Sequence, residues 1–238
     1  RTQRLLEGTD IRVPPLEDYA WRLWDYWERH LDPDLSLDRS LAGAVRGKVV
    51  LITGRPSGIG LAAAERCADA GAKVVIVARD PQKLEAARAR IAEHGGTVFA
   101  YQCDIADYQA CDALARQVLS EHGGVDVLVN NAGRSIRRSI DLSYDRFHDF
   151  ERTMQLNYFA VVRLTMALMP SMLSRGSGHI VNISSIGVLS NAPRFSAYVA
   201  SKAATEAWTR CAASEFADRG VSFTIINMPL VRTPMIAP

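Results

Sequence analysis

From Gly47 onward, the pattern of apolar and polar positions alternates between short apolar runs and longer amphipathic segments. The apolar runs are rich in Val and Ile, as in K-V-V-I-V-A at 73–78, and they are continuous rather than alternating. Strands that are buried on both faces of a parallel sheet have this composition. The longer segments carry apolar residues at helical spacing. We therefore predict an α/β fold of the Rossmann type, a doubly wound parallel sheet with helices on both faces.

The pattern predicts six strands and five main helices. We expect Pro170 to bend or interrupt the longest helix. A loop that contains Pro193 is expected to lead into the last helix. A seventh strand cannot be read before the chain ends at Pro238. The predicted strands are 48–53, 73–78, 97–102, 125–129, 179–183 and 221–227, and the predicted helices are 58–70, 81–94, 107–122, 144–175 and 198–219.

Residues 1–46 differ from the rest and are predicted to form an N-terminal helical arm or linker, followed by a nucleotide-binding domain at 47–238. Within the arm, residues 17–31 place Ala20, Trp24 and Trp27 at helical spacing. So many tryptophans favour a docking helix that packs on this domain, on a partner subunit or on a neighbouring domain. The alternative is a weak contact with a membrane surface.

Composition and charge narrow the class of protein. The chain has 238 residues, of which 48% are apolar, so one domain can bury a sizeable core. Its formal charge of +2 gives no argument for nucleic acid. No apolar run of 18 or more residues is present, so no spanning helix is expected. The chain begins at Arg1 rather than Met, and we expect it to be a piece of a longer chain.

The cysteines and histidines are scattered. The four cysteines form no C-x-x-C and are expected to be reduced thiols of a cytoplasmic protein. The five histidines form no H-E-x-x-H, so we expect no metal site.

A glycine-rich loop follows the first predicted strand. Residues Thr53–Gly60 read T-G-R-P-S-G-I-G, and the glycines at 54, 58 and 60 let the backbone turn tightly and approach a pyrophosphate. The helix that begins here directs its amides and the positive end of its dipole at the anion. Such a loop alone is weak evidence, but its place between the first strand and the first helix favours a dinucleotide site.

The end of the second strand selects the cofactor. An acidic residue there would bind the ribose 2′-hydroxyl of NAD, but this chain has Arg79. Arg79, with Arg55 in the glycine loop, suits a charge-assisted grip on a 2′-phosphate, so we predict NADPH. The alternative for Arg79 is a solvated strand-end cation. Asp80 precedes Pro81 and is predicted to cap the next helix.

The stretch 178–202 brings candidate catalytic groups together. Tyr198 and Lys202 are four residues apart, so they share one face of a helix. Ser185 follows the fifth predicted strand, where ligand crevices open in α/β sheets. A hydroxyl, a phenol and an ammonium can then converge on one carbonyl group. By itself the pattern is weak evidence, and the alternative is a surface serine and a solvated helix face.

Taken in order, these motifs resemble the short-chain dehydrogenase/reductase family over about 47–235. They are T-G-R-P-S-G-I-G, C-D-I with Asp104, N-N-A-G at 130–133, Asn157, Ser185 and the Tyr198/Lys202 pair. The resemblance implies a catalytic tetrad of Asn157, Ser185, Tyr198 and Lys202, with Ser185 rather than Ser184 because it lies thirteen residues before Tyr198. It also implies a set of cofactor contacts, namely Thr53, Gly54, Arg55, Ser57, Gly58, Ile59, Gly60, Arg79, Asp104, Ile105, Asn131, Ala132, Gly133, Tyr198, Lys202, Pro229, Val231 and Thr233.

Longer words such as D-R-F-H-D-F-E-R-T-M-Q-L-N-Y-F and M-P-L-V-R-T-P-M-I-A-P resemble bacterial long-chain fatty acyl-CoA reductases, in particular the C-terminal reductase domain of the two-domain type. The resemblance implies reduction of a fatty acyl-CoA or a fatty aldehyde, an adjacent reductase domain in a longer chain, and a dimer. Two alternatives stay open. One is a ketone or secondary-alcohol oxidoreductase of the same family, and the other is a non-catalytic NADPH-binding module.

The resemblance implies a mechanism. Tyr198 is the acid, and the positive charges of Lys202 and of the oxidised nicotinamide are expected to lower its pKa. Ser185 would hydrogen-bond the carbonyl oxygen, and Asn157 would hold a water that links Lys202 to solvent. Four arginines near the mouth of the cleft are unexplained by this scheme. We expect some of them to meet CoA phosphates, with solvated loop charge as the alternative. They are Arg134, Arg137, Arg138 and Arg194.

Overall fold

The computed structural model describes residues 15–30, 38 and 40–233 and divides into two units, 1–39 and 40–238. The first unit contains helix α2, Leu16–His30, which confirms the helix predicted for the arm. Leu31, which closed that predicted helix, lies outside the described residues. What the tryptophan-rich helix docks on stays a prediction. The second unit begins before the predicted boundary at 46/47, because a short helix at 41–45 belongs to it.

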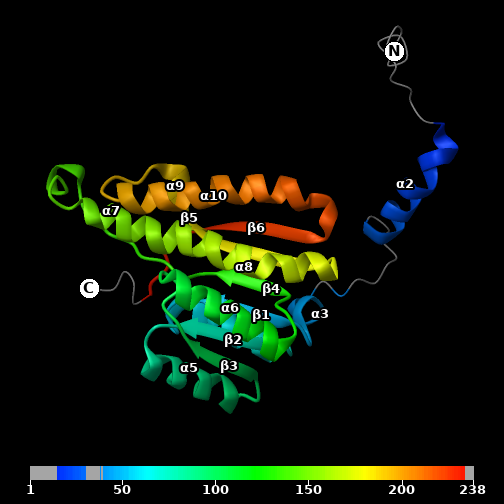
Figure 1. The fold of residues 1–238 in the computed structure, drawn as a ribbon, viewed down its shortest axis with the longest axis horizontal. Coiled ribbons are helices and arrows are strands. Elements are labelled where there is room, and N and C mark those ends of the chain that lie inside the picture. Colours follow the sequence, from blue (N-terminus) through cyan, green and yellow to red (C-terminus); the bar gives the residue numbers. More distant parts are fainter. Residues whose placement is uncertain (1–14, 31–37, 39, 234–238) are drawn as a thin grey trace, which may run out of the picture. The chain divides into compact units, whose positions relative to one another are not determined.

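The second unit is built on one parallel sheet of six described strands (Figure 1), as the apolar runs predicted. The strand order is β3-β2-β1-β4-β5-β6. The order reverses between β1 and β4, and ligands bind in such sheets where the carboxyl ends of the strands diverge at this point. The strands are β1 Val49–Thr53, β2 Lys73–Ala78, β3 Thr97–Gln102, β4 Val127–Asn130, β5 Gly178–Ser185 and β6 Val221–Met228.

Helices connect the strands, and most follow the predicted bounds to within a few residues. Two short helices, α3 and α9, lie where the sequence predicted none. Asp80 caps α5, since its Oδ1 accepts from the N–H of Lys83 at 3.1 Å, as expected. The helices are α3 Leu41–Val45, α4 Gly58–Asp69, α5 Pro81–Glu93, α6 Tyr108–His122, η1 Ile140–Leu142, α7 Phe147–Met154, η2 Gln155–Phe159, α8 Ala160–Arg175, α9 Ile186–Ser190, α10 Ser196–Phe216 and η3 Ala217–Arg219.

Two buried layers hold the sheet between its helices. Alternate residues of β1 and β2 point to opposite faces. Leu51 and Val75 pack with α6 and α8 on one face, and Val50 and Val74 pack with α4 and α5 on the other. Helix α10 packs on β5 and β6 beside α7, as Figure 1 shows. Burial on both faces explains why the strands are continuously apolar.

The helix predicted at 144–175 begins at Phe147 and is not regular. A turn of π-helix, η2, separates α7 from α8, while α8 runs through Pro170 to Arg175. The combined helix is long and apolar enough to cross a membrane by length and composition alone. Its apolar residues are accounted for by the core, because Leu164, Leu168 and Met172 are buried against the sheet.

Candidate active site

The glycine loop is held by the N-N-A-G segment, which follows β4. The side chain of Asn131 donates to the carbonyl of Thr53 at 2.9 Å. A Cβ on Gly54, whose φ is +122°, would lie 2.6 Å from Asn131 Nδ2, and one on Gly60 would lie 2.5 Å from it. These two glycines are therefore required by the packing of the loop on Asn131, a reason that the sequence reading did not include.

A cavity of about 500 Å³ opens between this loop and the ends of β2 and β3. Thr53 and Gly60 are buried beneath the loop rather than in the cavity wall, and Gly58 begins α4. Lys83, which the sequence reading missed, also faces the cavity. It lies three residues after the cap Asp80, in the first turn of α5, and that position is the signal for it. The predicted cofactor residues that line the cavity are Gly54, Arg55, Ser57, Arg79, Asp104, Ile105, Ala132 and Gly133.

Two ion pairs lie in the wall of this cavity. Arg79 Nη1 lies 3.4 Å from Asp104 Oδ2, and Lys83 Nζ lies 3.0 Å from Asp80 Oδ2. Both pairs are largely exposed, so each contributes little to stability. A phosphate bound here would take the place of an exposed carboxylate as the partner of Arg79 or Lys83. The residues therefore fit a phosphorylated adenosine, and Asp104 is near enough to Arg79 to orient it.

A second, more apolar cavity of about 250 Å³ adjoins the first at Gly133. Ser185, Tyr198 and Lys202 lie in its wall, so the structure brings these three predicted residues together. The remaining predicted cofactor residues in this wall are Ile59, Asn131, Pro229, Val231 and Thr233, and apolar wall residues that were not predicted include Ile186, Phe195, Val199, Met228 and Leu230.

The two serines at the end of β5 have different surroundings. Successive side chains of a strand point to opposite faces. Ser184 is 4% exposed and its hydroxyl donates to Glu206 at 2.5 Å. Ser185 faces the cavity, and its Oγ accepts from the N–H of Gly187 at 3.1 Å and caps α9. The geometry places Ser185, not Ser184, beside Tyr198, in the arrangement that the spacing predicted.

Lys202 is buried at the end of β5. The ammonium donates to the carbonyl of Ile183 at 2.6 Å. Burial lowers the pKa of Lys202 to about 8, and the charge of Glu206 opposes this fall. In the protein alone the pKa of Tyr198 is not lowered, and its lowering by Lys202 together with the oxidised nicotinamide stays a prediction. Burial raises the pKa of Tyr198, and a hydrogen bond with Ser185 only partly offsets it.

Asn157 lies in the π-turn and joins the loop after β4 to α10. Its Oδ1 accepts from the N–H of Arg134 at 2.8 Å, and its Nδ2 donates to the Arg134 carbonyl and to Ser201 Oγ, both at 2.9 Å. Its carbonyl accepts from Thr205 Oγ1 at 2.8 Å. Both polar ends of the side chain are thus occupied by protein groups, and the role of Asn157 in holding a water stays a prediction.

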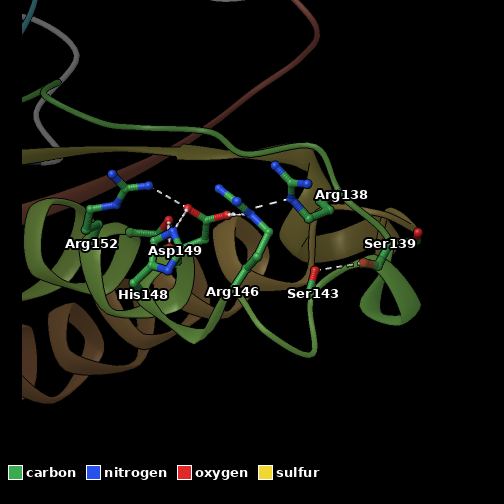
Figure 2. Close-up of polar contacts among 8 residues, drawn as sticks. Arg138, Ser139, Ser143, Arg146, His148, Asp149 and Arg152 are labelled. Atoms are coloured by element: carbon green, nitrogen blue, oxygen red, sulfur yellow. Dashed lines mark hydrogen bonds and ion pairs between the residues drawn. The ribbon is translucent and has the colours of Figure 1, made fainter.

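The arginines after N-N-A-G do not share one role. Figure 2 shows Arg138, Arg146, His148 and Arg152 around the carboxylate of Asp149, whose side chain is 5% exposed. Hydrogen bonds from Arg152 and then Arg146 hold the pKa of Asp149 below its usual range. Arg138 Nε lies 3.6 Å from Asp149 Oδ2, so one end of this side chain faces the acid.

The backbone of Arg138 joins two loops. Its N–H donates to the carbonyl of Arg194 at 2.7 Å. Arg194 has φ +69°, in the left-handed region, and it lies four residues before Tyr198. Arg134 lines the cofactor cavity. Of the four arginines, only Arg134 lines one of the two cavities.

Comparison with known proteins agrees with the family resemblance of the sequence motifs. A family model described as short chain dehydrogenase matches residues 48–238. A fatty acyl-CoA reductase of Acinetobacter baylyi is 58% identical over 82% of this chain, which spans 66% of that relative's length. A fatty acyl-CoA reductase of Mycobacterium tuberculosis is 48% identical over 87% of this chain and 72% of its own. A metagenomic short-chain oxidoreductase in complex with NADP is 34% identical, with a TM-score of 0.74 over 77% of this chain and 83% of its own.

Proposed function

This chain belongs to the short-chain dehydrogenase family, and from that premise we propose that it is an NADPH-dependent reductase of long-chain fatty acyl-CoA, of long-chain fatty aldehyde, or of both. It is an oxidoreductase of the NAD(P)-binding kind. The observation that carries the proposal is the apolar cavity that ends on Ser185 and Tyr198. An aliphatic chain can be buried there with its carbonyl group at the two hydroxyls. Two relatives that are named fatty acyl-CoA reductases support this substrate class.

The preference for NADPH rests on cations at the adenosine end. Arg55, Arg79 and Lys83 line one cavity, and Arg79 occupies the strand end where an acid would select NAD. The two acids in the wall, Asp80 and Asp104, each already face a cation. A 2′-phosphate would therefore meet an electropositive group of side chains with donors to spare.

The residues of the site act on the carbonyl oxygen. When bound, the nicotinamide supplies the hydride. Ser185 Oγ and the Tyr198 phenol donate hydrogen bonds to that oxygen and stabilise the charge that develops on it. Tyr198 then gives its proton to the oxygen, and the positive charge of Lys202 stabilises the phenolate that remains. With a thioester the adduct expels CoA and leaves an aldehyde. With an aldehyde the protonated product is the alcohol.

CoA is distinguished from a free aldehyde by its phosphates. Since Arg138 is engaged with Asp149, we propose Arg134, Arg137 and Arg194 as the candidates to meet them. Replacement of the exposed Arg137 by Ala is expected to raise KM for palmitoyl-CoA about tenfold and to leave KM for hexadecanal unchanged. Equal changes in both constants would contradict this assignment.

The proposed function is tested by NADPH oxidation, followed at 340 nm, with palmitoyl-CoA, hexadecanal and a long-chain ketone as separate substrates. Oxidation with the first or second is expected, and oxidation with the ketone alone would favour the ketone reductase of the same family. Tyr198→Phe is expected to reduce turnover by a factor of 100 or more, roughly, and to retain NADPH binding. If NADPH binds but wild type and variant turn over nothing, the chain is a binding module.

Three further proposals concern the setting of this chain. A dimer through the long helix (α7, η2 and α8) and α10 is supported by three exposed apolar side chains on the long helix, Phe147, Phe159 and Met166. An adjacent reductase domain in a longer chain is proposed from the sequence resemblance to two-domain reductases alone. A cytoplasmic location is supported by the four cysteines, all of which are free thiols. Size-exclusion chromatography with light scattering tests the first of these.

A further inference from the structure

Ser201, Thr205 and Glu206 form a buried polar stripe on α10. Its acid, Glu206, is not part of the predicted catalytic tetrad. Glu206 is 5% exposed, one turn after Lys202 on the same helix. Its Oε1 accepts from Ser184 Oγ at 2.5 Å and from Asn227 Nδ2 at 2.7 Å. Its Oε2 lies 3.5 Å from Nη1 of the exposed Arg210. A carboxylate is costly to bury, so its retention here needs a reason beyond packing.

The contacts of Glu206 hold the end of β5, which carries Ser185. Asn227 uses its second amide hydrogen to donate to the carbonyl of Ser185 at 3.2 Å. The preceding Ser184 is bound directly by Glu206, and the carbonyl before that, of Ile183, accepts from Lys202. Three consecutive residues of the strand end are thus fixed by α10 and by β6. Without Glu206, Ser184 and Asn227 would lose a shared acceptor inside the protein.

Glu206 is also the charged group that acts on Lys202. Burial lowers the pKa of Lys202, and the Glu206 charge opposes that fall. The helix α9 and the strand β6 carry no titratable side chain, and Asp218 and Arg219 of η3 lie at the other end of α10. Of the other titratable groups on described elements packed against α10, His179 contacts Thr224, Asp149 contacts Arg146, His148 and Arg152, and Tyr158 contacts Phe159. Glu151 of α7 is exposed.

We propose that Glu206 is a positioning residue of this site: its carboxylate anchors the strand end that presents Ser185, and it supplies the negative charge that accompanies the Lys202 ammonium. Glu206 touches neither the apolar cavity nor the cofactor cavity. It acts through Ser184 and Asn227 on geometry and through Lys202 on charge. The inference rests on the proposed function only in that the reaction needs Ser185 and a charged Lys202.

Four variants of the full chain separate these two actions. Glu206→Gln keeps an amide oxygen for Ser184 and Asn227 but removes the charge. Glu206→Asp keeps the negative charge, but its shorter side chain places the carboxylate farther from Ser184. Ser184→Ala removes only the hydrogen bond between Ser184 and Glu206. Glu215→Gln makes the same change as the first variant at an exposed position of the same helix. The measurements are thermal unfolding, kcat and KM with hexadecanal from pH 6 to pH 10, and Kd for NADPH by fluorescence over the same range.

Both kcat/KM and NADPH affinity are expected to decline at high pH as Lys202 loses its proton, and we call this decline the alkaline limb. For Glu206→Gln, we expect the alkaline limb to begin about one pH unit lower, because the lysine loses its proton more easily without the acid. For Ser184→Ala and Glu206→Asp, kcat should fall about tenfold at an unchanged limb, with KM within about twofold. Glu215→Gln should match wild type in all measurements.

The proposal is overturned if folded Glu206→Gln has the wild-type limb, whatever its unfolding temperature. If Glu206→Gln does not fold, wild-type kcat in both Glu206→Asp and Ser184→Ala overturns it instead. Should the wild type turn over none of the substrates, the proposed function fails. The pH dependence of NADPH affinity still tests the role of Glu206, because Lys202 lines the cavity that adjoins the nucleotide.

Discussion

Replacement of Lys202 by Met is expected to change the pH dependence of stability as well as activity. The side chain is 4% exposed, and burial takes the pKa of its ammonium from an ordinary 10.5 to about 8. Each factor of ten in proton affinity corresponds to about 1.4 kcal/mol, so the folded protein carries a cost of about 3 kcal/mol when this lysine is charged.

Stability rises with pH because the folded chain loses the Lys202 proton at a lower pH than the unfolded chain does. Below pH 8 both the folded and the unfolded chain hold the proton, and the full cost is present. Between pH 8 and 10.5 the unfolded chain keeps the proton while the folded chain has released it, so this group stabilises the fold as pH rises. Integrated from pH 7 to pH 10, the gain for wild type is about 2.5 kcal/mol. Lys202→Met has no proton to lose at this position, so its stability does not gain in this way.

The assay is urea unfolding of wild type and Lys202→Met, followed by circular dichroism in reductant at pH 7, 8, 9 and 10. The comparison is made between proteins at each pH, because burial raises the pKa of Cys103 to about 11 and of Cys111 to about 12, which destabilises both proteins above pH 9. The free energy of unfolding of the variant should fall by about 2.5 kcal/mol relative to wild type over this range.

The difference in unfolding free energy between wild type and Lys202→Met also contains the loss of the hydrogen bond to Ile183, and this contribution does not depend on pH. Lys73→Met, at an exposed position where β2 begins, is the matched control and should run parallel to wild type. A gap between wild type and Lys202→Met that stays constant to within about 0.5 kcal/mol would refute the reasoning, since errors of extrapolation are of that size.

Two other predictions test the ends of the sheet. Arg79→Ala should raise KM for NADPH about tenfold or more and leave KM for NADH nearly unchanged, because only NADPH offers the 2′-phosphate; steady-state rates with each cofactor check this. Gly220→Ala should lower the free energy of unfolding by about 2 kcal/mol or more, measured by urea titration. Gly220 has φ +74° and its Cβ would lie 2.0 Å from the carbonyl oxygen of Gly176, at the amino ends of β5 and β6, whereas the proposed site lies at their carboxyl ends. An unchanged midpoint would contradict it.

The sheet and its loops could be predicted because their signals are local. Continuous Val and Ile runs mark doubly covered strands, and the glycine-rich loop marks a tight turn, in which Gly54 and Gly58 have positive φ. The distinction of Ser185 from Ser184 was implied by the family resemblance, and the structure gives its physical form, since adjacent residues of β5 face opposite sides.

The buried stripe of α10 could not be predicted, because its partners are distant in sequence. Ser201, Thr205 and Glu206 have the periodicity of a solvated helix face, yet all three are buried. Their acceptors and donors come from the π-turn at 155–159 and from the ends of β5 and β6. Polar residues at helical spacing indicate one face of a helix, but not whether that face meets water or other polar groups.

The π-turn at Gln155–Phe159 sets the rotational phase between two halves of one helix. Each residue advances an α-helix by about 100°, so one residue more in a turn rotates everything before it by that angle relative to everything after it. The phase of α8 is fixed by Leu164 and Leu168 in the core, and the phase of α7 by Asp149 and its arginines. Loss of a single residue here would therefore keep the helix and misdirect Asp149.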